Sequence, residues 1–516
     1  MSNRSRALAT AAALAIAVAG LATTAQAQSL QDAIALAYRT NPTLLAQRAN
    51  QRALDETYVQ ARSGLRPTLS VSGGTGYSYR DLPDTPPTPG FDFDGDGIED
   101  FPGDPGSDNI SDGTTASVGV SLNQNLYTGG RIAHGINAAE ASVLAGRENL
   151  RDVEQEVMQS VIQAYVDVLR DEEVLVIRRD NIAVLQRQLE ESNARFEVGE
   201  ITRTDVAQSE ARLAQSESDL AVAEAQLSVS RAAFAAVVGQ APATLEATPA
   251  LPPAPTDFDV ALDSGLVRNP ALAAAEYNLR AAEAQVAQTR AEYRPSVGLS
   301  ASLGNSFDSL SNLDLNDSSR EFSATANISV PLFTGGLNAS RVAQALERAN
   351  AAQIGVEGQR RNVLQLVSSA YAQVIAARST LQAGEEAVRA ATIAAEGVRQ
   401  EAQVGLRTTL DVLNQELELR AAQVTLANAR RNEYVAQAAL LAAMGQLSGA
   451  SLAPVEAYDP ADNFQRVRNR GAVPWEFLVE SLDRIAAPAI VPANDQEDAP
   501  VDAQLKSEVI QTAPGT

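Results

Sequence analysis

The chain has 516 residues, no cysteine, and 64 acidic against 40 basic residues, for a net charge of −24. The absence of cysteine excludes disulfides, thiolate metal sites and a lipid-modified N-terminal cysteine. The acidic balance, with only short basic runs, argues against nucleic-acid binding. Alanine is abundant and aromatic residues make up 4%, which is more typical of long, closely packed helices than of an enzyme core.

Residues 1–27 are expected to be a secretory signal peptide. Arg4 and Arg6 precede an apolar run over residues 7–22, and Ala25-Gln26-Ala27 offers a cleavage site. The alternative is a first transmembrane helix, which the short, alanine-dominated run disfavours. We expect the mature chain to begin at Gln28 and to contain no transmembrane helix, since no uninterrupted apolar stretch of about 18 residues follows.

The rest of the chain is a tandem duplication. Asn41-Pro42 and Arg66-Pro67 recur 228 positions later, and Leu126–Gly130 recurs 206 positions later as Leu332–Gly336. The copies therefore differ by one 22-residue length change between Pro67 and Leu126. A long duplication predicts a pseudo-symmetric object. The expected order is repeat 1 at 28–240, a proline-rich linker at 241–258, repeat 2 at 259–446, an irregular segment at 447–487 with one short helix at 476–484, and a disordered acidic tail at 488–516.

Each repeat opens with one helix-forming stretch, at 30–63 and 260–293, which ends at the Arg-Pro pair. The apolar period then changes to two, which predicts strand pairs at 66–80/113–127 and 294–308/319–333. A soluble sandwich would give the same alternation. The strand length, the uncharged polar face and the aromatic residues near the strand ends favour a membrane β-barrel. Four strands cannot close a barrel, so several copies must share one, and three copies would supply twelve strands.

A long helix follows each strand pair, at 131–198 and 337–404, and a return helix follows it, at 203–239 and 409–445. A helix of 68 residues is about 100 Å long. Apolar residues recur every seven positions from Val206 to Phe234 and from Val412 to Leu426, which predicts coiled-coil packing. We expect each return helix to run back along half the length of the long helix. The opening helix of the next repeat is expected to cover the remaining half.

These motifs, in this order and duplicated, resemble the TolC-like outer-membrane channel family, with Val404–Leu413 as a further matching segment. The resemblance implies an α+β membrane protein: a homotrimer with a twelve-stranded barrel in the outer-membrane lipid and an α-helical tunnel in the periplasm of a Gram-negative bacterium. It implies the exit duct of a tripartite export system, for type I protein secretion, small-molecule efflux or both, with a periplasmic adaptor and an inner-membrane ABC or RND transporter. The absent cysteine fits the non-lipidated branch. The main alternative is an adhesive trimeric surface protein with a coiled-coil stalk, and an enzyme is not expected.

The turns at Gly199 and Gly405 are expected to form the periplasmic mouth. An aspartate just inside a helix start ordinarily caps that helix. The resemblance implies a gate in which Asp411 is an aperture carboxylate and Arg407 is the latch arginine, with Asp205 as its acidic partner. Asn414 and Ala402 stand where the family has a carboxylate and a tyrosine. The expected adaptor-docking tips comprise Gly199, Ile201, Thr202, Gly405, Leu406 and Thr408.

The acidic loop between the first two strands contains a candidate calcium site. Asp92, Asp94, Asp96 and Asp100 occupy ligand positions 1, 3, 5 and 9, with Gly97 at position 6. The closing glutamate of an EF-hand is absent, because position 12 is Gly103. A solvated acidic loop is the alternative, and no other cofactor is expected.

Overall fold

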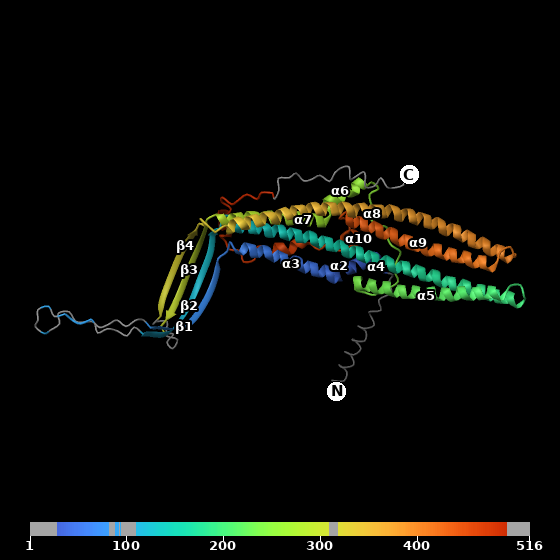
Figure 1. Ribbon diagram of the computed structural model, residues 1–516, viewed down its shortest axis with the longest axis horizontal. Coiled ribbons are helices and arrows are strands. Elements are labelled where there is room, and N and C mark those ends of the chain that lie inside the picture. Colours follow the sequence, from blue (N-terminus) through green and yellow to red (C-terminus); the bar gives the residue numbers. More distant parts are fainter. Residues whose placement is uncertain are drawn as a thin grey trace, which may run out of the picture.

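The computed structural model describes residues 28–81, 88–91, 93, 97, 110–308 and 318–492. A β-sheet lies at one end of an elongated molecule, and helices run from it to two hairpin tips at the opposite end (Figure 1). The expected signal peptide, Asp92, Asp94, Asp96, Asp100 and the tail from residue 493 lie outside the described residues.

The sheet has four antiparallel strands in the order β1 (Thr68–Asp81), β2 (Ile110–Tyr127), β3 (Ser296–Phe307) and β4 (Ser319–Ser329). Strand β4 ends four residues before the expected 333, since Pro331 has no N–H for the ladder. The register aligns one apolar row and, on the opposite face, one serine row. These rows are Val71, Val120, Leu303 and Phe322, and Ser70, Ser121, Ser302 and Ser323.

The apolar row is largely uncovered, with Val71 at 72% exposure and Phe322 at 71%. On the other face serine hydroxyls pair across the strands, Ser70 with Ser121 at 2.7 Å and Ser302 with Ser323 at 2.8 Å. One apolar face and one small-polar face suit a barrel wall between lipid and water.

Each opening stretch is two helices, which corrects the single helix expected. They are α2 (Leu30–Thr40) and α3 (Pro42–Ser63) in repeat 1, and α6 (Phe258–Arg268) and α7 (Pro270–Arg290) in repeat 2, where a 3₁₀ turn, Ala291–Tyr293, follows. The break lies at Asn41 and Asn269, because a residue before proline is pushed into the extended region.

The same two asparagines correct the expected path of the return helices. Asn41 Nδ2 donates to the Val237 carbonyl at 2.9 Å, and Asn269 Nδ2 donates to the Ala443 carbonyl at 3.2 Å. Each return helix therefore ends against the opening helices of its own repeat, not of the next one. The side-chain oxygen of each asparagine also caps the helix that follows it.

The long helices are α4 (Arg131–Glu197) and α8 (Leu337–Gln403), and the return helices are α5 (Arg203–Val238) and α9 (Thr409–Ala443). The chain reverses at each tip, so both pairs are antiparallel hairpins, unlike a parallel adhesive stalk (Figure 1). Among the described residues, α5 alone is long and apolar enough to cross a membrane by length and composition. Its packing against α4 identifies it as a hairpin helix.

The segment after α9 contains three short helices where one was expected: α10 (Gly449–Leu452), α11 (Pro460–Val467) and α12 (Glu476–Asp483). Ser448 and Asp459 cap α10 and α11 with their side chains. The largest core cluster lies at mid-length, where Tyr165 and Phe234 are fully buried among α2, α4, α5 and this segment.

Candidate gate and docking tips

The first tip joins α4 to α5 through a glycine turn. Gly199 has a φ of 81°, which glycine adopts without the strain of a side chain. Its N–H donates to the Phe196 carbonyl at 2.9 Å. Asp205 then accepts from the backbone N–H of Thr202 at 2.9 Å and from its hydroxyl at 2.8 Å. In this chain Asp205 therefore caps the start of α5.

The second tip has the same backbone design. Gly405 has a φ of 78°, and its N–H donates to the Ala402 carbonyl at 3.1 Å. Asp411 accepts from the Thr408 N–H at 3.0 Å and from its hydroxyl at 2.8 Å, while Thr408 Oγ1 accepts from the Asp411 N–H. This is a complete capping box.

The two tips place the acid and the arginine of their ion pairs on opposite sides of the turn. In the first tip the arginine is on the descending helix, with Arg195 Nε 3.1 Å from Glu200 Oε2. In the second tip the acid is on the descending helix, with Glu401 Oε2 2.7 Å from Arg407 Nε. Within one chain Arg407 thus binds Glu401, and a contact between Arg407 and Asp205 stays a prediction.

Capping holds both aspartates in the charged form. Hydrogen bonds from the side chain and backbone of Thr202 lower the pKa of Asp205. Those from the backbone and side chain of Thr408 lower the pKa of Asp411, and the charge of Arg407 adds to that effect. The Glu401 carboxylate raises the pKa of Arg407. All three expected gate residues therefore keep a formal charge at neutral pH.

The two positions that depart from the family pattern have defined surroundings. Asn414 Oδ1 accepts from Arg212 Nη2 at 3.3 Å, which joins α9 to α5 near the tips. Ala402 lines a cavity of about 320 Å³ among α4, α8 and α9. The small methyl group of Ala402 leaves space that a tyrosine would occupy.

Several charged residues near the second tip were missed in the sequence. Glu416 is 2% exposed and forms ion pairs with Arg399 on α8 and, at 3.7 Å, with Arg420 on α9. Glu416 lies between Val412 and Leu419 of the seven-residue pattern, and its burial could not be recognised from the sequence, because glutamate is usually exposed.

The tips also present more apolar surface than expected. Leu406 is 74% exposed, as expected for a docking residue, and Val198 and Val404 are equally exposed at 72% and 71%. The two valines stand directly before the turn glycines. The described residues contain no group of three acidic or histidine side chains that could hold a metal, and the calcium loop stays a prediction.

Comparison with known proteins gives one consistent match. A family model described as outer membrane efflux protein matches residues 33–240 and 261–446. The outer membrane efflux protein BepC of Brucella suis is 32% identical over 455 residues, covering 87% of this chain and 93% of BepC. The alkaline protease secretion protein AprF of Pseudomonas aeruginosa is 27% identical over 323 residues, covering 61% of this chain and 67% of AprF.

The solved structures agree in fold. The crystal structure of the outer membrane protein VceC from Vibrio cholerae matches with a TM-score of 0.65 and 21% sequence identity. The match covers 81% of this chain and 96% of VceC. At that identity the likeness supports the duplicated architecture of sheet and hairpins.

Proposed function

This chain belongs to the outer membrane efflux protein family, and we propose that it works without catalysis, as the passive exit duct of a tripartite export system. The chain is an outer-membrane channel protein whose helices extend into the periplasm. The composition of the β-sheet is the observation that best supports a duct. The sheet has one apolar row and, on the opposite face, one serine row, and it lies at one end of long helices of about 100 Å. In a barrel the apolar row would face lipid and the serine row would face the lumen.

Three copies of the chain share one barrel of twelve strands. The sheet ends in β1 on one side and β4 on the other, and lipid does not tolerate open strand edges. Leu332 and Phe333, three and four residues after β4, are 92% and 91% exposed in the single chain, which leaves them free for contact with a neighbouring copy.

The duplication predicts the register between copies. Within the chain Val120 of β2 pairs with Leu303 of β3. The matching positions in the other repeats are Ala326 of β4 and Thr75 of β1. Ala326 of one copy should therefore lie opposite Thr75 of the next.

Cysteine cross-linking tests this register, since the natural chain has no cysteine. The double variant Ala326→Cys/Thr75→Cys should form covalent trimers on mild oxidation. The control Ala326→Cys/Leu69→Cys, shifted by six positions on the same face of β1, should not. Cross-linking of the control alone would reject the register, and failure of both pairs would reject the shared barrel.

The gate is formed by Asp205, Arg407 and Asp411 at the periplasmic mouth. A ring of like charges at a narrow pore binds cations and sets selectivity. Asp411→Ala should therefore weaken the block of bilayer conductance by multivalent cations. Asp459→Ala, which removes a capping aspartate far from the tips, is the control. Unchanged block in Asp411→Ala would remove this residue from the gate.

The tips dock the adaptor, through Gly199, Ile201, Thr202, Gly405, Leu406 and Thr408. Gly405→Trp should abolish export while trimers still assemble. Gly405→Asn is the matched control, because asparagine tolerates a positive φ and adds little bulk. Export that survives in Gly405→Trp would show that docking uses another surface.

The transporter partner is an inner-membrane ABC or RND pump, and the cargo is protein, small toxic molecules or both. The names of the relatives point both ways, since BepC is called an efflux protein and AprF a protease secretion protein. A deletion strain assayed for secreted proteins and for drug susceptibility tests both routes. Loss of neither would contradict the export function.

A further inference from the structure

Helix α12, near the C-terminus, has two contrasting faces. Glu476, Val479 and Asp483 are spaced three and four residues apart and are buried. The other face, together with Ile485 in the turn directly after the helix, carries large apolar side chains that stay uncovered in the chain. Their exposures are 63% for Phe477, 59% for Leu478, 43% for Leu482 and 60% for Ile485.

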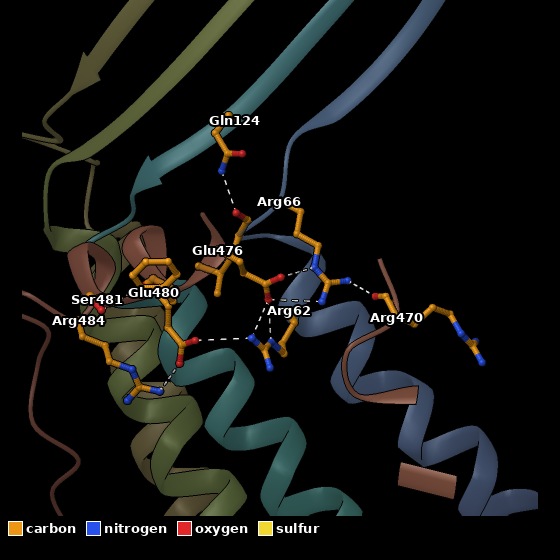
Figure 2. Close-up of polar contacts among 10 residues, drawn as sticks. Arg62, Arg66, Gln124, Arg470, Glu476, Glu480, Ser481 and Arg484 are labelled. Carbon is orange, nitrogen blue, oxygen red and sulfur yellow. Dashed lines mark hydrogen bonds and ion pairs between the residues drawn. The ribbon is translucent and has the colours of Figure 1, made fainter. Parts of the chain in front are cut away.

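The buried face fastens α12 where the strands meet the helices (Figure 2). Glu476 forms ion pairs with Arg62 Nη2 at 2.8 Å and with Arg66 Nε at 2.9 Å. Both arginines flank the corner between α3 and β1. Glu476 is 3% exposed, so its charge is enclosed by its two partners and holds α12 in one orientation.

Asp483 fastens the other end of α12 to the start of α4. Gly130, the residue before α4, has no side chain to cap that helix. Asp483 supplies the missing acceptor: Oδ1 accepts from the Thr128 N–H at 2.5 Å, and Oδ2 accepts from the Ala133 N–H at 3.2 Å. The position of α12 is therefore fixed relative to both β2 and α4.

Two contacts place α12 below the lipid-facing side of the sheet. Tyr127 pairs with Val297, which shares the apolar face, and its hydroxyl donates to the Ile485 carbonyl at 3.1 Å. Leu65, three residues before β1, lies in the same buried apolar cluster as Val479. The uncovered face of α12 thus continues the apolar face of the barrel at its periplasmic end, where headgroups of the inner leaflet lie.

We propose that α12 is an interfacial anchor whose exposed face, Phe477, Leu478, Leu482 and Ile485, lies in the inner phospholipid leaflet of the outer membrane. Trp475, which precedes the helix, is 47% exposed, and tryptophan favours the membrane interface. Arg484, directly after the helix, is 50% exposed and pairs with Glu480 at 3.0 Å, and its guanidinium can also bind a lipid phosphate. Lipid is the occupant because the patch adjoins a surface that lipid already covers.

Trp475 is the only tryptophan and reports directly on this contact. The full-length trimer is reconstituted into phosphatidylethanolamine–phosphatidylglycerol vesicles that contain a headgroup spin-labelled phospholipid. Trp475 fluorescence should fall by about half in labelled vesicles, and the variant Phe477→Gln/Leu478→Gln/Ile485→Gln should lose most of that quenching. The control Val267→Gln, an 80% exposed valine on α6, should be quenched like the natural protein.

Absence of quenching in the natural protein would overturn the anchor, whether or not the triple variant folds. If a neighbouring copy covers this face instead, lipid quenching is absent and the triple variant loses its SDS-resistant trimer. Quenching that persists unchanged in a folded triple variant would also reject the exposed face as the lipid contact.

Discussion

The two helical hairpins are copies in the duplication, but they differ at the contact between their two helices, here called the seam. In the first hairpin, small polar residues of α5 bond to α4: Asn181 Nδ2 donates to Ser216 Oγ at 2.5 Å, and Ser230 donates to Asp171. The equivalent positions of the second hairpin, 206 residues later, are alanines. They are Ala387 and Ala422 for the first pair, and Ala377 and Ala436 for the second.

This difference shows that one hairpin of a duplicated pair can fix the axial position of its two helices while the other lets its helices approach closely. A buried hydrogen bond fixes the axial position of one helix against the other, because sliding leaves its donor unpaired. Alanine seams let helices approach closely and have no directional bond to break. The second hairpin keeps its polar fixing point near the tip, at Glu416. We therefore expect α8 and α9 to slide more readily than α4 and α5 above that point.

The largest expected effect comes from removing Glu416. Glu416→Ala leaves Arg399 and Arg420 without their acid and should lower the opening free energy of α9 by about 2 kcal/mol. The value is below the roughly 3–5 kcal/mol typical of a broken buried ion pair, because the Arg399 side chain is 44% exposed. Hydrogen exchange of α9 amides measures it. Glu210→Ala, the exposed equivalent in the first hairpin, should have almost no effect, and equal effects would erase the distinction.

A smaller effect is expected at the polar seam. Asn181→Ala leaves the buried Ser216 hydroxyl unpaired and should lower the opening free energy of α5 by about 1 kcal/mol. The double variant Asn181→Ala/Ser216→Ala reproduces the alanine pair of the second hairpin and should recover most of that loss. Hydrogen exchange of α5 amides tests both variants. If the opening free energy of α5 is lower in the double variant than in the single variant, the alanine pair cannot replace the polar pair in this hairpin.

The smallest effect should be the pH response of the tips. A lowered carboxyl pKa gives stability that is full above the unfolded value of about 3.9 and is lost as pH falls through the lower folded value. Protection of the Thr202 and Thr408 amides should therefore fall below about pH 4. Exchange rates, corrected for intrinsic pH dependence, measure this loss.

Arg407 should distinguish the tips in the same experiment. Arg407→Ala removes one of the causes that lower the pKa of Asp411, so the midpoint for Thr408 should move to higher pH. The midpoint for Thr202 should stay in place. A shift at both tips would show that Arg407 acts across the mouth and not only within its own turn.

The sequence predicted the features that repeat. The Arg-Pro pairs, the strand alternation and the Thr-Gly-Gly turns each follow from local geometry, so helices α4 and α8 begin where expected. The Asn-Pro pairs were recognised as repeats, but their role was not. Their side chains bond to carbonyls 196 and 174 residues away, a relation that no local pattern reveals.

The parts that occur once were predicted least well. Three short helices follow α9 where one was expected: α12 was predicted, but α10 and α11, only four and eight residues long, were not. The roles of Glu476 and Asp483 on α12 were also missed, since their partners meet them only in the folded chain. The residues expected to form a gate lie at the tips, and their role as a gate stays a prediction. Within the chain Arg407 pairs with Glu401, six positions before it. Pairing across copies depends on an assembly that one sequence does not contain.

Asp483 has a consequence for the whole ring. Each chain has two strand-to-helix junctions and a single α12. Among the described residues, the start of α4 is capped by the Asp483 carboxylate as well as the Thr128 hydroxyl, while the start of α8 has the Thr334 hydroxyl alone, 3.5 Å from the Asn338 nitrogen. In a ring of three chains, long helices with the Asp483 contact (α4) and without it (α8) would alternate where the helices meet the strands. A torque applied at the tips would then bend the three α8 helices before the three α4 helices. The wall of six long helices would therefore respond to torque with threefold symmetry.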